Sequence, residues 1–313
     1  MSAVPVGRAR QLVLIRGPLE GLYRTFDHVE SATDPVHIVR RFRSRADREV
    51  AGFCAAALAF GRVASVLQSI EALLKVMGGA PAAFVRAFDP ARDAPALGPL
   101  VHRWIRGVDL AALMVILQRM LVESGSIERF FLENDDPAAP DVGPGLDAFS
   151  RRAMETDLRA VYTAGRGLRR TPGRSGPGVC YFFPRPSAGS ACKRLNLFLR
   201  WMVRKDAIDL GAWTEVSPSR LVVPLDTHVI RVARCLRLTR YASPGWRMAS
   251  EITASLRAID PADPVRYDFS LCHIGMMNAC GYGRRQKDTQ CPLRGVCRPR
   301  GGGRRGRGRA QPL

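Results

Sequence analysis

Lysine is scarce in this sequence: only four of its 48 basic residues are lysines, which leaves 44 arginines. The four are Lys75, Lys193, Lys205 and Lys287. Arginine stays protonated in proteins, so it cannot act as an amine nucleophile or form a Schiff base. A genome bias toward arginine codons would produce the same ratio. Any reaction that needs an amine must still draw on this short list, so each lysine is a candidate for chemistry.

Long hydrophobic runs are also missing. The longest nearly apolar stretch covers residues 51–60, about half of what a membrane-spanning helix needs. The first thirty residues lack the pattern of a signal peptide. With 46% hydrophobic residues the chain as a whole is not disordered. We therefore expect a folded cytoplasmic protein that is associated with the nucleoid, has no membrane partner and is monomeric.

Acidic residues are too few to balance the arginines, and the net charge is +20. Residues 298–313 supply six of these charges in an Arg/Gly-rich segment without acids, which predicts a disordered tail. Residues 1–297 still carry about +14. This charge predicts a polyanionic partner, and double-stranded DNA is the first choice.

Apolar residues recur at intervals of three and four over residues 35–42, 45–77 and 99–121, which predicts an all-α fold. We expect one helical domain over residues 1–297 with two helical lobes. An acidic linker (133–147) and a basic loop (165–178) interrupt the pattern. The basic loop carries Arg169 and Arg170 and is either a solvated connector or a contact to phosphates.

Two segments of the region 185–240 carry residue types suited to catalysis. Asp226 stands at the N-cap position of a predicted helix, after the extended segment that ends at Pro224. Lys193 lies in the first turn of another predicted helix, after a tight turn that ends at Gly189. Read separately, Asp226 is a helix cap and Lys193 is a surface lysine.

Together, the two segments resemble the helix-hairpin-helix DNA glycosylase superfamily. The run Leu225-Asp-Thr-His-Val-Ile-Arg-Val is similar to the aspartate signature of the endonuclease III branch, and residues 189–193 (Gly-Ser-Ala-Cys-Lys) look like the end of its glycine hairpin. The hairpin departs by having Ala191 where a second glycine is usual. The spacing from Lys193 to Asp226 is closer to that of the archaeal oxidised-guanine glycosylases. Over most of residues 20–297 the chain also resembles a bacterial family of conserved hypothetical proteins.

The glycosylase resemblance implies a fold, an activity and a set of residues. Lys193 would attack C1′ of a damaged nucleotide whose base is flipped out, and Asp226 would stabilise the cationic sugar. The implied activity is that of a base-excision repair DNA glycosylase with AP lyase activity, with oxidised bases as the first class to test. Residues expected at the DNA are Gly189, Ser190, Arg194, Arg200, Arg169 and Arg170.

Four of the eight cysteines fall within residues 272–297. The spacing of Cys272, Cys280, Cys291 and Cys297 resembles the iron–sulfur loop of endonuclease III relatives, and only the final pair matches it fully. A [4Fe–4S] cluster, a structural zinc ion and four thiols without metal all fit this spacing. The other four cysteines lie among apolar neighbours and are expected to be buried.

Two further functions remain open at this stage. A nucleic-acid-binding protein without catalysis would keep the scaffold and the charge but lack a base pocket. An RNA-directed role is supported only by the Arg/Gly tail. The aromatic residues that could line a base pocket cannot be distinguished from core residues in the sequence; they are Phe60, Trp104, Phe182, Phe183 and Trp201.

Overall fold

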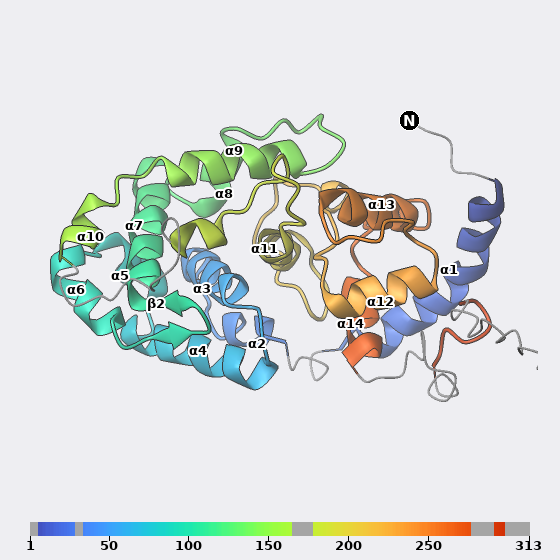
Figure 1. Ribbon diagram of the computed structural model, residues 1–313, viewed down its shortest axis with the longest axis horizontal. Coiled ribbons are helices and arrows are strands. Elements are labelled where there is room, and N and C mark those ends of the chain that lie inside the picture. The colour runs from blue at the N-terminus through green and yellow to red at the C-terminus, as the bar shows by residue number, and fades with distance from the viewer. Residues whose placement is uncertain (1–5, 29–33, 165–177, 277–290, 298–313) are drawn as a thin grey trace, which may run out of the picture.

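The computed structural model describes residues 6–28, 34–164, 178–276 and 291–297. Within these residues the chain is predominantly helical, and its strands form a single hairpin of two residues each. The all-α prediction is therefore confirmed. Figure 1 shows two groups of helices, with α11 (Lys193–Val203) lying between them.

The first group surrounds α7, which is buried along most of its length. Its elements are α2 (Val36–Val39), α3 (Arg45–Ala57), α4 (Val63–Val76), α5 (Pro81–Arg86), α6 (Pro90–Leu97), β1 (Val101–His102), β2 (Ile105–Arg106), α7 (Gly107–Glu123), α8 (Ile127–Leu132), α9 (Gly143–Met154) and α10 (Arg159–Ala164).

The second group joins the two ends of the chain, because α1 packs against α14. Its elements are α1 (Val6–Phe26), the 3₁₀ helix η3 (Pro218–Arg220), α12 (Thr227–Cys235), α13 (Trp246–Arg257) and α14 (Asp268–Met276). The 3₁₀ helix η2 (Gly178–Phe182) belongs to the first group, because it packs against α7. Helices α12 and α14 approach closely at Gly275, where an added Cβ would lie 2.5 Å from the Cβ of His228.

The predicted continuous helix over residues 45–77 is broken in the structure. Helix α3 ends at Ala57, and α4 begins at Val63. Gly61 adopts a φ of 107° in the connection, a conformation that suits glycine and stops a right-handed helix. The break matters for the site described below, because it brings the backbone of residues 59–61 to the wall of a cavity.

Two other predicted element boundaries differ from those in the structure. The segment 99–121 was expected to be helical throughout, but residues 101–106 form the small hairpin and α7 begins only at Gly107. The acidic segment 133–147 is a turn only as far as residue 142, since α9 begins at Gly143. The side chain of Asp135 in this turn is buried and pairs with Arg220, so the acidic segment is not merely a solvated linker.

Helix α11 is buried on both sides, which the sequence pattern did not predict. Its apolar side packs against α3. The opposite side holds Arg200 and Arg204, which are 2% and 3% exposed and pair with carboxylates instead of facing solvent. Asp209 bonds both arginines. Buried ion pairs of this kind are costly to break, because removing one partner leaves an uncompensated charge.

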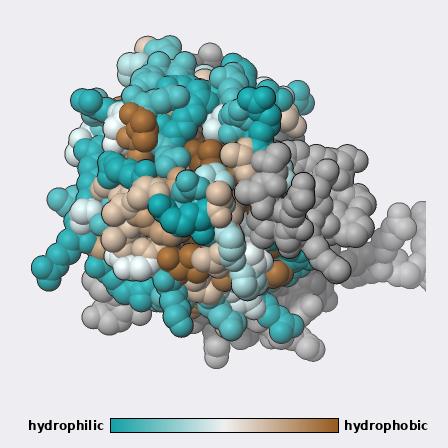
Figure 2. All heavy atoms as spheres, turned by 90° about the vertical axis from the view of Figure 1, so that its left-hand side faces the viewer, coloured by the Kyte–Doolittle hydropathy of each residue, from teal (hydrophilic) through white to brown (hydrophobic). Residues whose placement is uncertain are grey.

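Figure 2 shows the end of the molecule formed by the first group of helices, whose surface is mainly hydrophilic with separate apolar patches. Large apolar side chains exposed on the molecule include Val63, Val101 and Val122. No helix in the described part of the chain is both long and apolar enough to cross a membrane.

The start of α7 packs closely against the end of α6, and a substitution at Gly107 tests this contact. A Cβ on Gly107 would lie 2.2 Å from the backbone oxygen of Leu97 and 2.7 Å from the Cα of Gly98. Backbone atoms cannot move aside as a flexible side chain can, so we expect Gly107→Ala to lower the free energy of unfolding by about 1–3 kcal/mol. Urea denaturation measures this loss.

The matched control is Gly21→Ala in α1, where an added Cβ has no neighbour within 4 Å. Alanine is the better helix former, so this control should leave the stability unchanged or raise it by up to about 1 kcal/mol. Equal losses in both variants would contradict the described contact between α6 and α7.

Candidate active site

Asp226 caps helix α12, as the sequence predicted. Its backbone is extended, and its Oδ1 accepts hydrogen bonds from the backbone N–H groups of His228 and Val229, both at 2.8 Å. The two bonds satisfy donors that a helix start otherwise leaves unpaired. They also fix the direction of the carboxylate, so that its other oxygen is available for a second contact.

Lys193 is the first residue of α11. The turn before the helix is closed by the backbone bond from the N–H of Gly189 to the oxygen of Pro186, and Gly189 has a φ of 80°. The N-cap residue Cys192 is also left-handed, with a φ of 47°. The Nζ atom of Lys193 donates to the backbone oxygen of Ala59 at 3.2 Å, in the break between α3 and α4.

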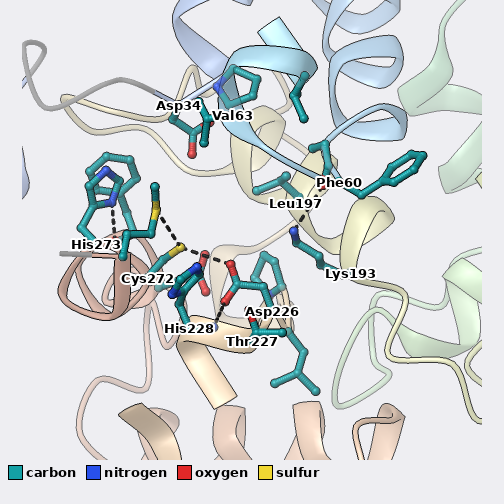
Figure 3. A pocket seen from close by; sticks show the side chains of 18 of the residues that line it. Asp34, Phe60, Val63, Lys193, Leu197, Asp226, Thr227, His228, Cys272 and His273 are labelled. Atoms are coloured by element: carbon teal, nitrogen blue, oxygen red, sulfur yellow. Dashed lines mark hydrogen bonds between the residues drawn. The ribbon is translucent and has the colours of Figure 1, made fainter. Parts of the chain in front are cut away.

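Lys193 and Asp226 line one cavity of about 490 Å³ (Figure 3). Its walls come from the residues just before α2, from the connection between α3 and α4 with the start of α4, from α11, from the start of α12 and from α14. Figure 3 shows Lys193 on one side and His273 on the other, with Asp226 between them. Lys75 and Lys205 are instead exposed, so Lys193 is the lysine that the described structure places in the cavity.

Cys272 belongs to the same cavity. Its Sγ donates a hydrogen bond to Oδ2 of Asp226 at 3.2 Å (Figure 3). Burial raises the pKa of the Cys272 thiol well above its ordinary value, and the nearby Asp226 carboxylate raises it further. The thiol therefore stays protonated and acts as a donor to Asp226, a contact that the sequence did not predict.

The predicted DNA contacts have different positions in the structure. Gly189 is exposed and Ser190 is partly exposed, both in the turn before α11. Arg194 is directed inward: it donates to the backbone oxygens of Ala57 and Tyr181, and its guanidinium lies 3.7 Å from the centre of the Tyr181 ring.

Arg200 is not on the surface, where a phosphate contact would need it, because its side chain is 2% exposed and is bound by buried carboxylates beside the cavity. It cannot reach a phosphate from this position. Its place on the polar side of a helical pattern suggested a surface residue, but that side of α11 faces α14 and the loop after α11.

Arg169, Arg170, Cys280 and the tail 298–313 lie outside the described residues. Within the described part no three histidine, cysteine or acidic side chains come together as a group that could hold a metal ion. Cys291 is buried and Cys297 is partly buried, whereas Cys272 contacts Asp226. The four-cysteine cluster therefore stays a prediction.

Of the cysteines expected to be buried, Cys180 is exposed, which corrects that expectation.

Two acidic residues of the cavity were missed in the sequence, Asp34 and Asp268. Asp268 opens α14, and its Oδ2 accepts a hydrogen bond from Nη1 of Arg200 at 2.7 Å. Burial raises the pKa of Asp268 to about 7, and the neighbouring Asp226 raises it while Arg200 lowers it. An acidic residue at the start of a largely apolar helix is the sequence signal that could have identified Asp268.

Among the aromatic candidates for a base pocket, Phe60 lines the cavity. Trp104 is half-buried and packs against Phe60, with ring centres 4.8 Å apart. The other three, Phe182, Phe183 and Trp201, are core residues.

Comparison with known proteins gives a family but no function. No curated protein and no solved structure matches the chain. One family model, described as a protein of unknown function (DUF2400), matches residues 34–277, and all the residues that line the cavity, from Asp34 to Met276, fall within this match. The chain therefore belongs to the DUF2400 family.

Proposed function

We propose that this protein is a DNA glycosylase with AP lyase activity, in which Lys193 is the nucleophile and Asp226 stabilises the cationic sugar. The observation that carries the proposal is that Lys193 and Asp226, from two separate helix starts, line one cavity. A volume of about 490 Å³ lies in the range of small-molecule sites and suits an extruded nucleotide. The scaffold on which we place this chemistry is the helix-hairpin-helix glycosylase fold.

The reaction needs one nucleophile and one stabilising charge. The lone pair of Nζ bonds to C1′, and the bond from C1′ to the base breaks, so that the base leaves with the bonding electrons. The base takes up one proton and the lysine gives up one. Opening of the sugar ring then leaves a Schiff base between Nζ and C1′, from which β-elimination breaks the C3′–O bond.

The surroundings of Asp226 support its part in this reaction. Its Oδ1 is held by two backbone N–H groups and its Oδ2 by the Cys272 thiol, so the carboxylate is oriented before a substrate arrives. A fixed negative charge beside the cavity favours the positive charge that develops on the sugar. No step of the proposal uses a metal, and the cysteine cluster remains a separate hypothesis.

The charge of the chain supports DNA as the partner. Exposed arginines occur close in sequence to residues that line the cavity: Arg62 stands between Gly61 and Val63, and Arg247 lies three residues after Pro244. Side chains of this kind bind phosphates without reading sequence, and the binding weakens as salt rises. A non-catalytic nucleic-acid-binding protein would share this property, so binding alone does not test the proposal.

The experiment is a cleavage assay on matched duplexes that carry an oxidised guanine, an oxidised pyrimidine or an abasic site. The proposed function predicts release of a base from one of the lesion duplexes and strand cleavage at the abasic site. Tight duplex binding with no base release and no cleavage on any of them would reject the glycosylase and favour the non-catalytic binding protein.

Asp226→Asn separates the capping role of this residue from its chemical role. Asparagine caps helices about as well as aspartate, so we expect the free energy of unfolding to fall by less than about 1 kcal/mol. The rate of base release should fall by about 10²-fold or more, because the amide carries no charge to stabilise the sugar. Single-turnover kinetics and thermal unfolding measure the two effects.

Asp226→Ala is the companion variant. It removes the cap as well and should lower the stability by about 0.5–2 kcal/mol. If Asp226→Asn keeps the wild-type rate, Asp226 is a structural cap and not part of the reaction.

A further inference from the structure

Three residues that line the cavity each hold a buried polar atom without a hydrogen-bond partner among the described residues. These atoms are Nη2 of Arg200, Oδ1 of Asp268 and Nε2 of His273. Arg200 is 2% exposed and Asp268 is 3% exposed. Buried polar atoms are nearly always paired in folded proteins, since an unpaired one costs about 1–3 kcal/mol. Three of them around one cavity indicate a polar occupant.

The hydrogen bonds that these side chains already make determine whether each unpaired atom is a donor or an acceptor. Arg200 uses Nε on Asp209 at 3.2 Å and Nη1 on Asp268 at 2.7 Å. Its Nη2 lies 3.9 Å from Oδ2 of Asp34, an ion pair too long for a hydrogen bond, so Nη2 is held in place with its hydrogen-bonding capacity unused. His273 donates from Nδ1 to the backbone oxygen of Phe269 at 2.9 Å. With Nδ1 carrying the proton, the neutral ring has Nε2 as its acceptor. The set is one donor and two acceptors.

The rest of the cavity suits a flat ring. Phe60, Leu197 and Phe269 line it with apolar surface, which favours the faces of an aromatic heterocycle. Lys193 lies on the opposite side of the cavity from His273 (Figure 3). A nucleotide whose sugar lies at Lys193 could therefore direct its base toward α14.

Resting on the proposed function, we infer that Arg200, Asp268 and His273 form the base-reading set of the cavity and determine which base is accepted. Arg200 Nη2 donates to a carbonyl oxygen or ring nitrogen on the edge of the flipped base. Asp268 Oδ1 and His273 Nε2 accept from N–H groups on the same base. The competing interpretation is that Arg200 and Asp268 are a structural ion pair only, as Arg200 and Asp209 are.

Equilibrium binding by fluorescence anisotropy distinguishes the two interpretations. All variants are made in full-length Lys193→Gln protein, so that the DNA is not consumed. The probes are duplexes that differ at one position, which holds 8-oxoguanine, dihydrouracil, hypoxanthine or a tetrahydrofuran sugar without a base. The ratio of the Kd for the tetrahydrofuran duplex to that for a base-bearing duplex gives the affinity that is due to the base.

We expect this ratio to be about 10 or more for at least one of the three bases. Adding Asp268→Asn should reduce it by about 5-fold or more, down to a limit of about 1 at which the base no longer contributes affinity. His273→Phe keeps the ring but removes the acceptor, so it should reduce the ratio in the same direction. Asp209→Asn is the matched control: Asp209 is as buried and bonds the same arginine, yet it does not line the cavity. It should lower the stability without lowering the ratio.

The inference is overturned if Asp268→Asn reduces the ratio no more than Asp209→Asn does, or if none of the three bases raises affinity above the tetrahydrofuran duplex. The proposed function is tested separately by covalent trapping of the wild-type protein on abasic DNA. Normal trapping with no base-dependent affinity overturns only the base-reading set, whereas absent trapping overturns the proposed function.

Discussion

Lys193→Gln is expected to abolish covalent trapping to abasic duplex DNA under borohydride and to slow base release by on the order of 10³-fold or more. The reason is chemical: glutamine has no amine, so no bond to C1′ and no Schiff base can form. Glutamine can still reach toward the backbone oxygen of Ala59, which Nζ contacts at 3.2 Å, so the stability should change by no more than about 1.5 kcal/mol. Gel detection of the reduced adduct measures the first effect, and thermal unfolding measures the second.

The control is the same substitution at Lys75, a solvent-exposed position in the last turn of α4. Lys75→Gln removes one positive charge and should weaken DNA binding slightly without affecting the amount of adduct. An adduct of wild-type yield in Lys193→Gln would show that another amine performs the reaction, or that the adduct is non-specific.

Of the variants described, Arg200→Met is expected to lower the free energy of unfolding most, by about 3–5 kcal/mol at pH 8. Methionine fills similar volume but leaves Asp209 and Asp268 buried with one cation fewer. Urea denaturation monitored by tryptophan fluorescence measures the free energy of unfolding across a series of pH values.

The pH dependence follows from the two carboxyl groups. In the wild-type fold, burial raises the pKa of Asp209 to about 6 and that of Asp268 to about 7, although Arg200 lowers both. A group whose pKa is raised on folding binds its proton more tightly in the folded state. Stability is then highest below the unfolded pKa of about 4 and falls as the pH rises to the folded pKa. Removing Arg200 raises both values further, so the loss of stability in the variant should be small at pH 5 and largest above pH 7.

Arg257→Met provides the comparison. Arg257 is half-buried, and its guanidinium donates to the neutral backbone oxygen of Ser219 at 3.1 and 3.0 Å. Its loss should cost about 1 kcal/mol with little dependence on pH over the same range. A loss in Arg200→Met that is independent of pH would mean that the buried carboxylates are not coupled to Arg200 as described.

The sequence was most informative where local chemistry determines structure. The position of Asp226 before an apolar-periodic helix predicted its N-cap bonds, and the turn that ends at Gly189 predicted the start of α11. Both depend on contacts within a few residues along the chain. The helical periodicity likewise predicted the all-α class, which the described structure confirms.

What the sequence could not predict depends on contacts between distant segments. The side of α11 that carries Arg200 and Arg204 looks solvent-exposed in the pattern, but Asp209, Asp263 and Asp268 cover it in the fold. A charged residue gives the same periodic signal whether it meets water or a buried partner. The break after α3 was missed because residues on both sides of it continue one apolar pattern.

Some residues of the cavity could be predicted from local sequence signals, and others depend on contacts between distant segments. Lys193 and Asp226 were found by residue type and by resemblance, whereas Asp268 and the Cys272 contact became visible only when α14 was placed against α12. Cys272 illustrates the limit of spacing arguments, since its position relative to three other cysteines suggested a metal ligand. In the fold its thiol donates to the carboxylate of Asp226.

The most direct test of the central claim is to locate the amine that bonds to DNA. Wild-type protein is trapped on an abasic duplex with borohydride, digested with nuclease and protease, and the modified peptide is identified by mass spectrometry. The proposed function predicts the sugar remnant on Lys193, and the assignment is unambiguous because the chain has only three other lysines. A remnant on Lys75, Lys205, Lys287 or the N-terminal amine, or no adduct at all, would contradict it.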